Sequence, residues 1–492
     1  MKNPTSHSTK KISYSILKKS RSIILVFTIN LTVYGQTVED NANALLESSL
    51  RKIEKNDLDG ALSDILKVIE LAPTSPGAYY NKGFIESKQE KYKEALMNAD
   101  KALSLDPKMW EAYILRGLMH TQLTNYEKAL ADYNSALVIN PKSAEAYLNR
   151  GVVLRKMGNF EKAWTDYDKA LEINPNLSEA YLDRGILELA MEDYKTAIPD
   201  FDKAIALNPK MGNAYEGRGT ANGGLGNYEK ALLDLSKAIE LNPREGLIYF
   251  KRGYIKNKLG KFQEALTDFN NAIMFGHKSD EVYYHRGLAK FQLTDLMGAI
   301  IDYDQAIQLN PKMGNAYFDR GTIKITLGQP SIALSDFNKA VELNPSAKTY
   351  TGRALCKMHN GNLDEAWEDL DKALKLDPIF KETYLLRGMI AAQQKNYPAS
   401  IQEFTKAIEL NPTFSEAFYH RGTTYALMED VNHALADLNE AIRLNPTMAL
   451  AYEMRGICKE SQKDLVGACE DWHKSLQLGS KSAIELITDD CK

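Results

Sequence analysis

The chain has 492 residues, of which 44% are hydrophobic, and its formal net charge is −4. This slight acidic excess does not favour a general nucleic-acid surface, which requires clustered lysine and arginine. Four cysteines in a chain of this length exclude a disulfide-dense scaffold, although they leave room for a single disulfide.

The N-terminal segment has the features of a cleaved signal peptide. Several basic residues precede the apolar run IILVFTINLTVYG at 23–35. This run is too short to cross a bilayer as a helix, but it matches the hydrophobic region of a signal peptide. We expect cleavage between Gly35 and Gln36, followed by a short linker at 36–41; an uncleaved membrane anchor is the alternative. No later segment is apolar enough to span a membrane.

From residue 42 onward the sequence repeats itself every 34 residues. A proline and a glycine each recur at this interval: Pro73, Pro107, Pro141, Pro175, Pro209 and Pro243, and Gly83, Gly117, Gly151, Gly185, Gly219, Gly253, Gly287 and Gly321. A period of roughly 20–50 residues is typical of solenoid proteins, in which each unit stacks on its neighbours. The chain is therefore predicted to be one long array of repeats.

Residues 178–209 illustrate a single repeat. Ala180 and Leu187 fall on one face of a first helix. Asp193 offers an N-cap oxygen to a second helix, and Pro209 ends that helix because the residue before proline avoids the helical conformation. Each repeat is thus predicted to be a helical hairpin, whose two helices we call helix A and helix B. One hairpin cannot bury its own apolar face, so neighbouring hairpins must stack.

Small residues such as Gly185 and Ala197 recur in nearly every repeat, near the middle of helix A and the start of helix B. In this pattern the chain resembles the tetratricopeptide repeat (TPR) family over residues 42–479, with twelve clear repeats after a degenerate first one. The resemblance implies an all-α, right-handed superhelical solenoid in which helix A lines a concave groove, the usual place for peptide ligands. A short capping helix is expected at 480–492, because a solenoid must shield its last apolar face.

The repeats depart from the usual TPR pattern in one consistent way. An arginine stands directly before the helix A glycine, and an acid follows sixteen residues later, as in Arg252–Asp268, Arg286–Asp302 and Arg320–Asp336. Because the two helices of a hairpin are antiparallel, these positions face each other, and we expect one Arg–carboxylate pair inside each repeat. Binding of an anionic ligand by the row of arginines is the alternative, although each charge already has a partner.

The positions that the resemblance places in the groove are apolar or aromatic in the middle repeats: Phe250, Tyr254, Tyr284, Leu288, Phe291, Phe318, Ile325, Leu355 and Met358. Aromatic residues concentrated on a surface indicate a binding patch. The alternative is that they cover the gaps between stacked helices. Lysines recur beside them, at Lys256, Lys290, Lys324 and Lys357. Such a row would suit an acidic, partly hydrophobic peptide or the acidic surface of a folded partner, and a solvated helix face is the alternative.

Near the C-terminus two cysteines are placed so that they could meet. Cys469 lies near the start of the last helix B, and Cys491 lies near the end of the predicted cap. Antiparallel packing would bring them together, so Cys469–Cys491 is the expected disulfide in an oxidising compartment. Cys458 is a competing partner.

Sequence motifs for chemistry are absent: there is no CxxC, no histidine pair at metal-ligand spacing, no G-x-S-x-G and no P-loop. We therefore expect no enzyme, no metal and no cofactor, but a scaffold or adaptor that binds a protein or peptide in its groove. The YGQ cut site and the GACEDW tail resemble exported TPR proteins of Gram-negative bacteria, which implies the periplasm or the inner face of the outer membrane. The alternative is a structural part of a cell-envelope assembly that binds through its edges or convex face.

Overall fold

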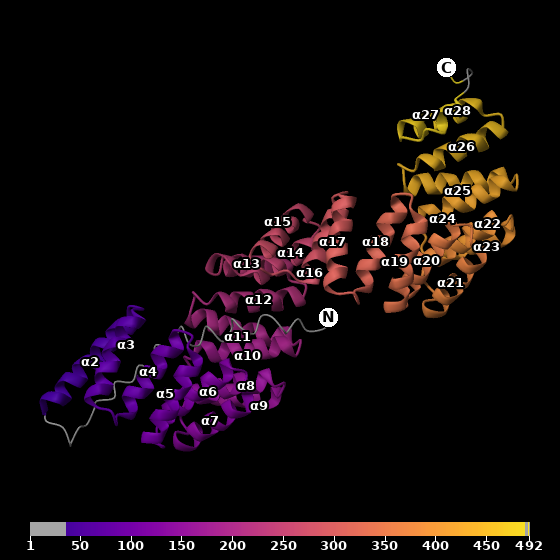
Figure 1. The fold of residues 1–492 in the computed structure, drawn as a ribbon. Helices are drawn as coiled ribbons and strands as arrows, with labels where there is room; N and C mark the ends of the chain where they lie inside the picture. Colours follow the sequence, from indigo (N-terminus) through magenta and orange to yellow (C-terminus); the bar gives the residue numbers. More distant parts are fainter. Residues whose placement is uncertain (1–35, 488–490, 492) are drawn as a thin grey trace. The chain divides into compact units, whose positions relative to one another are not determined.

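The computed structural model of the protein describes residues 36–487 and Cys491, and the predicted signal peptide at 1–35 lies outside the described residues. Every regular element of the described part is a helix, as predicted for an all-α solenoid (Figure 1). The chain divides into two compact units, unit 1 up to Ile255 and unit 2 from Lys256 onward. None of the described helices combines the length and the apolar character needed to cross a membrane.

Unit 1 is a series of antiparallel hairpins in which even-numbered helices are helix A and odd-numbered helices are helix B. Its helices are α2 (Gln36–Glu54), α3 (Leu58–Leu71), α4 (Pro76–Lys88), α5 (Tyr92–Leu105), α6 (Trp110–Gln122), α7 (Tyr126–Ile139), α8 (Ala144–Lys156), α9 (Phe160–Ile173), α10 (Ser178–Ala190), α11 (Tyr194–Leu207), α12 (Gly212–Gly224) and α13 (Tyr228–Leu241). Helix α14 (Gly246–Lys258) contains the boundary between the units.

Unit 2 continues the same pattern. Its helices are α15 (Phe262–Met274), α16 (Asp280–Gln292), α17 (Leu296–Leu309), α18 (Gly314–Thr326), α19 (Pro330–Leu343), α20 (Ala347–His359), α21 (Leu363–Leu376), α22 (Lys381–Gln393), α23 (Tyr397–Leu410), α24 (Ser415–Leu427), α25 (Val431–Leu444), α26 (Ala449–Ser461), α27 (Leu465–Gln477) and α28 (Ala483–Leu486).

The two ends of the solenoid differ from the sequence prediction. The predicted linker at 36–41 is instead the start of α2, because Ala42 and Leu46 are buried against α3 and the helix extends outward from this anchored part. Within the predicted capping helix at 480–492, the described residues contain the four-residue helix α28. Gly479, with φ +100, ends the preceding helical segment, and Ile487 is already extended.

The turns between the helices are short and have a fixed chemistry. The turn from helix A to helix B requires a residue with positive φ, which is Gly158 (φ 79) in one hairpin and Glu192 (φ 61) in the next. Most B helices end at an Asn-Pro pair, and after α11 the Asn208 side chain accepts a hydrogen bond from the Lys210 N–H at 3.2 Å. Because similar turns recur along the chain, most repeats are 34 residues long.

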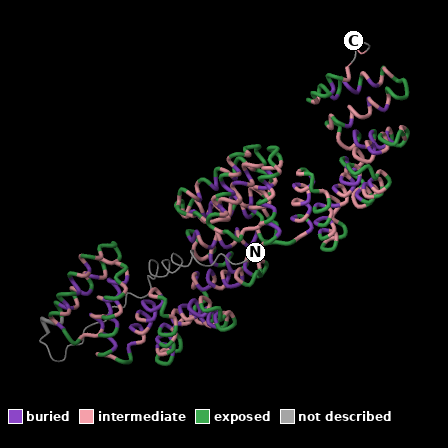
Figure 2. Tube along the Cα trace, turned by 45° about the vertical axis from the view of Figure 1, so that its right-hand side comes forward, coloured by how far each residue is buried: buried purple, intermediate pink, exposed green. Residues whose placement is uncertain are grey.

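The core is distributed along the chain instead of gathering at one centre, and buried residues recur in every hairpin in Figure 2. In most hairpins an aromatic or branched side chain of helix B packs onto the helix A glycine. In the fifth hairpin this residue is Phe201, which is fully buried. A Cβ atom added at Gly185 would lie 2.9 Å from the Phe201 ring, so only glycine allows this approach.

Candidate functional site

The predicted Arg–carboxylate pairs can be compared with the structure inside unit 2. Arg286 Nε lies 2.9 Å from Asp302 Oδ2, and Arg320 Nε lies 3.0 Å from Asp336 Oδ2. In both hairpins the Nη2 group donates to the other oxygen of the same carboxylate, and each aspartate is at most 2% exposed. Such bidentate pairs are stronger and more directional than ordinary hydrogen bonds. Arg252 belongs to unit 1 and Asp268 to unit 2, so this pair stays a prediction.

Each arginine also reaches the preceding hairpin, a contact that the sequence analysis missed. Arg320 Nη1 donates to Asp304 on α17, and the guanidinium lies 5.4 Å from the centre of the Tyr317 ring. Arg286 repeats the arrangement with Asn270 and Tyr283. The guanidinium therefore joins two stacked hairpins, and its donors are already used within the solenoid.

The four recurring lysines do not form a free cationic row, which corrects both predictions made for them. Each ammonium group lies near the buried aspartate of its own hairpin: Lys256–Asp268 at 2.9 Å, Lys290–Asp302 at 2.8 Å, Lys324–Asp336 at 2.8 Å and Lys357–Asp369 at 2.9 Å. The lysine side chains are only 14–18% exposed. The reason is helical register, because the lysine follows the arginine by four residues and so shares its face of helix A.

The predicted apolar groove residues of unit 2 act mainly as packing residues. Tyr284, Leu288 and Phe291 pack on Ala299, Tyr303 and Ile323, while Phe318 and Ile325 pack on Ala333, Phe337 and Cys356. Met358 is 8% exposed, and Leu355 packs on the cluster that contains it. Phe250 and Tyr254, in α14, are partly buried. This arrangement agrees with the alternative that these side chains cover the gaps between helices.

Polar and cation–π contacts nevertheless link A helices of neighbouring hairpins, over three successive hairpins. The Tyr284 hydroxyl on α16 donates to Asp319 Oδ2 on α18 at 2.8 Å. Lys348 on α20 lies 4.2 Å from the centre of the Phe318 ring. We call Tyr284, Phe318, Asp319 and Lys348 the unit 2 patch. Asp319 and Lys348 were not among the predicted groove residues, since charged residues at single positions give no periodic signal.

The contacts of Asp319 in the unit 2 patch compensate only part of the effect of its burial. Burial raises the pKa of Asp319, while the Tyr284 hydroxyl and the Lys348 charge lower it without cancelling the effect of burial. The nearby Tyr303 hydroxyl is buried and has no hydrogen-bond partner within the described residues. The patch can therefore accept additional hydrogen bonds or a counter-charge from a partner.

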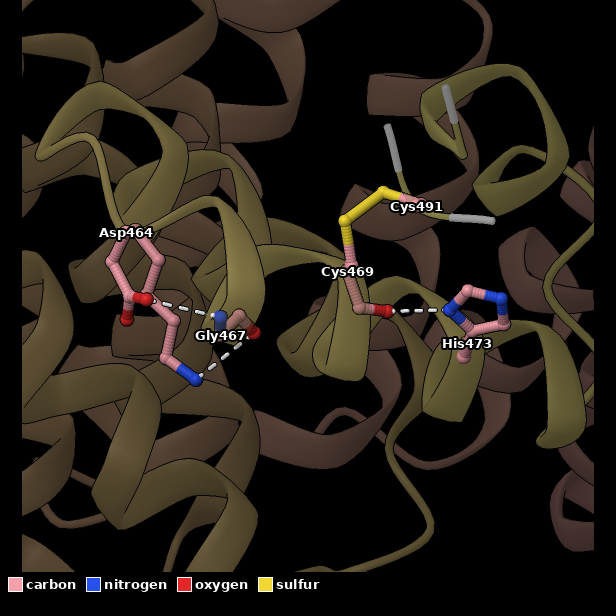
Figure 3. The surroundings of a disulfide bond; sticks show 6 residues. Asp464, Gly467, Cys469, His473 and Cys491 are labelled. Atoms are coloured by element: carbon pink, nitrogen blue, oxygen red, sulfur yellow. Dashed lines mark hydrogen bonds between the residues drawn. A yellow bond between two sulfur atoms is a disulfide. The ribbon is translucent and has the colours of Figure 1, made fainter. Parts of the chain in front are cut away.

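The C-terminal segment is held to the last hairpin by a disulfide. Cys469 on α27 and Cys491 are joined, with their Cα atoms 5.3 Å apart (Figure 3). Ser480 and Ser482 donate hydrogen bonds to Glu453 on α26, at 2.7 and 2.8 Å. Cys458, the competing partner, is a buried free thiol. The short helix α28 is thus attached to α26 and α27 at two places.

No cluster of potential metal ligands occurs among the residues that the structure describes.

Family models described as tetratricopeptide repeat or TPR repeat match the chain between residues 76 and 448. The matched ranges are 76–109, 117–158, 144–177, 182–244, 217–276, 280–313, 318–378, 357–413 and 415–448. A search of curated proteins found no match to the sequence.

Several solved structures match the chain over much of its length. A tetratricopeptide repeat protein from Parabacteroides merdae is 29% identical over 51% of this chain and 99% of its own, with a TM-score of 0.41. A chain from the crystal structure of the APC/C hetero-tetramer Cut9–Hcn1 is 15% identical to this chain, with a TM-score of 0.44. The match covers 95% of this chain and 98% of that one. Yeast Tom70 is 18% identical over 84% of this chain and 93% of that chain, with a TM-score of 0.41.

Proposed function

The chain belongs to the tetratricopeptide repeat family, and from this premise we propose that it is a non-catalytic scaffold or adaptor that binds a protein or peptide through the unit 2 patch. TPR arrays are typical of protein–protein interaction, but the fold alone names no partner. The observation that carries the proposal is the placement of Tyr284, Asp319 and Lys348 on the A helices of three successive hairpins. Their side chains provide charged and hydrogen-bonding groups along that side of unit 2.

The chemistry of the patch favours a partner with both apolar and charged groups. The aromatic residues Tyr284 and Phe318 are partly buried, so only part of each ring is accessible to a partner. Lys348 is a cation beside an aromatic ring, and Asp319 is a carboxylate that burial makes costly to ionise. A partner that brings a carboxylate to Lys348 and a donor to Asp319 would satisfy both groups.

We further propose that the protein is exported to the periplasm or to the inner face of the outer membrane. The basic and apolar residues before Gln36 support export. The Cys469–Cys491 disulfide also supports an oxidising compartment, because structural disulfides are rare in the cytosol.

A second candidate function, a structural part of an envelope assembly, is favoured by one observation. Helix α17 exposes Met297 and Ile301 on one face, at 61% and 64% exposure. These residues stand four apart on a helix B, so they share a face that helix A does not use. Binding through this face would leave the unit 2 patch free.

Affinity capture with mass spectrometry from the native source would distinguish the two candidates. The variants are Lys348→Glu in the patch and Ile301→Lys on α17. The matched control is Lys312→Glu, which makes the same charge change at an exposed position in the turn before α18. Circular dichroism would verify that each variant is folded.

Loss of a specific partner in Lys348→Glu alone is the expected result. Loss in Ile301→Lys alone would favour the structural role and contradict the patch. If parent and variants retain the same proteins throughout, neither surface is the binding site.

A further inference from the structure

The hairpin formed by α10 and α11 places two acidic side chains against each other. The position three residues after the helix A glycine, which we call the acid-facing position, holds the lysines of unit 2 whose ammonium groups lie 2.8–2.9 Å from buried aspartates. Lys459 in the last hairpin likewise lies 2.9 Å from Asp471. In α10 this position holds Glu188, while the buried acid of the hairpin is still Asp200.

One other hairpin has a glutamate at the acid-facing position, but its opposite residue differs as well. Glu86 on α4 accepts a hydrogen bond at 2.6 Å from the side-chain amide of Asn98 on α5. Asn98 stands where Asp200 stands in α11, and its amide supplies the donor that a carboxylate lacks. Two carboxyl groups occupy this pair of positions only in the hairpin of α10 and α11.

The Glu188 carboxyl group is buried and incompletely bonded. The residue is 3% exposed, and its Oε2 atom has no hydrogen-bond partner within the described residues. Burial raises the pKa of Glu188 and so does the charge of Asp200, while the Thr196 hydroxyl and the Arg184 charge lower it. The two carboxyl groups therefore act on each other, and their interaction is unfavourable when both are ionised.

In the hairpin of α18 and α19, by contrast, the charges cancel. Arg320 pairs with Asp336 of its own hairpin and with Asp304 of the preceding one. Lys324 supplies a second positive charge, 2.8 Å from Asp336 Oδ2. Two cations thus face two anions, which is the arrangement that a partly buried group of charges requires.

The hairpin of α10 and α11 lacks this balance. Arg184 pairs with Asp200 and with Asp168 of the preceding hairpin in the same way as Arg320 pairs with its aspartates. Glu188 then adds a negative charge where a lysine would add a positive one. Relative to the balanced hairpin the deficit is two positive charges, which is the charge of one divalent cation.

The place of the missing ammonium group is surrounded by oxygen ligands. Lys290 Nζ contacts the Gly298 carbonyl at 3.3 Å in addition to its aspartate, and the lysines of three other hairpins make the same contact. The carbonyl at this position of α11 belongs to Thr196. A cation in this place would meet that carbonyl, one oxygen of Asp200 and the Glu188 carboxyl group.

We propose that Glu188, Asp200 and the Thr196 carbonyl bind Ca²⁺ in the place that a lysine ammonium group occupies in other hairpins. Ca²⁺ accepts carboxylate and carbonyl oxygens in irregular geometry and completes its coordination with water, whereas Mg²⁺ demands a near-ideal octahedron. The described residues contain no group of three His, Cys, Asp or Glu ligands, so water must supply the remaining bonds. We therefore expect a weak site, with a dissociation constant of about 0.1–1 mM.

Thermal unfolding of the full chain at pH 7.5 tests the proposal. CaCl₂ at about 10 mM should raise the Tm of the parent by at least about 3 °C relative to NaCl of equal ionic strength. Glu188→Gln should lose this shift. Glu188→Lys should lose it too and should melt above the parent in EDTA, because it restores the lysine of the unit 2 hairpins. The matched control, Glu86→Gln, should keep the shift.

Three outcomes contradict the proposal. Equal Ca²⁺ shifts in the parent and in Glu188→Gln would place the bound cation elsewhere. Loss of the shift in Glu86→Gln as well would show that the effect does not depend on the acid pair. No shift in the parent, together with a higher Tm of Glu188→Gln in EDTA, would show that Glu188 and Asp200 share a proton. The inference goes beyond the scaffold function and uses no residue of the unit 2 patch, so partner capture by Lys348→Glu is decided independently.

Discussion

The substitution Asp369→Asn tests the internal ion pairs of the solenoid. Asp369 on α21 is fully buried and accepts hydrogen bonds from Arg353 Nε at 2.8 Å and Nη2 at 2.7 Å. Lys357 Nζ lies 2.9 Å from Asp369 Oδ2, the oxygen that also accepts from Arg353 Nε. Burial alone would raise the pKa of Asp369, but the hydrogen bonds from Arg353 and Lys357 outweigh burial, so the pKa lies below its usual value.

The sign and size of the effect follow from this environment. Because the pKa of Asp369 is lowered in the folded state, its stabilisation is present above about pH 4 and is lost as pH falls through the folded pKa. Removing one partner of a buried pair costs about 3–5 kcal/mol. Asparagine keeps one acceptor oxygen, so we expect a loss near 3 kcal/mol at pH 7, which is roughly 6–12 °C in Tm for a unit of this size.

The chain contains a matched control at Glu403, the equivalent acid on α23. Its Oε1 lies 3.2 Å from Arg387 Nε, which makes no hydrogen bond of normal geometry, and burial raises the pKa of Glu403. When an acid has a higher pKa in the folded than in the unfolded state, the folded protein loses stability as the pH rises. Glu403→Gln should therefore leave Tm at pH 7 unchanged or slightly higher.

Thermal unfolding followed by circular dichroism at pH 7 measures both variants. The expected result is a large fall for Asp369→Asn and none for Glu403→Gln. Equal shifts for the two variants would refute the reasoning, because burial and hydrogen bonding would then not control the contribution of the acid. An unchanged Tm for Asp369→Asn would show that the pair is not formed in solution.

Three further predictions concern other parts of the fold. Burial raises the pKa of Glu188 from 4.5 to about 7, so stability should fall between these pH values, and Glu188→Gln should flatten the pH dependence of Tm and raise Tm at pH 7.5. Reducing the Cys469–Cys491 disulfide, which spans 22 residues, should cost the C-terminal hairpin about 3 kcal/mol and increase its proteolysis, while the Tm of unit 1 stays constant. Gly388→Ala should destabilise more than Gly361→Ala in urea denaturation, since an added Cβ at Gly388 meets an aromatic ring of α23 at 2.5 Å. Gly361 has open space and only a strained φ of +81.

The sequence was sufficient to predict the hairpins, because each depends on contacts within about 34 residues. The positions of glycine, proline and the N-cap residues repeat with that interval, so one repeat predicts all the others. The spacing of Arg286 and Asp302 indicated facing positions on antiparallel helices, and their atoms lie within hydrogen-bond distance. Local register explains both results.

Contacts between hairpins could not be predicted in the same way. The sequence paired Arg320 with Asp336 alone, yet Arg320 Nη1 also donates to Asp304 of the preceding hairpin. Nor did the sequence indicate that the Tyr284 hydroxyl donates to Asp319 of the next hairpin. Each of these outcomes depends on which side chain the neighbouring hairpin offers.

The sequence by itself therefore determined the repeat, the helices and the Arg–carboxylate pairs inside a hairpin, such as Arg286–Asp302 and Arg320–Asp336. The tertiary structure alone decided which polar groups have hydrogen-bond partners and which do not, as at the unit 2 patch. The physical reason is that helical periodicity fixes the direction of a side chain on its own helix. Burial and hydrogen bonding also depend on the chemistry of the helix stacked against it.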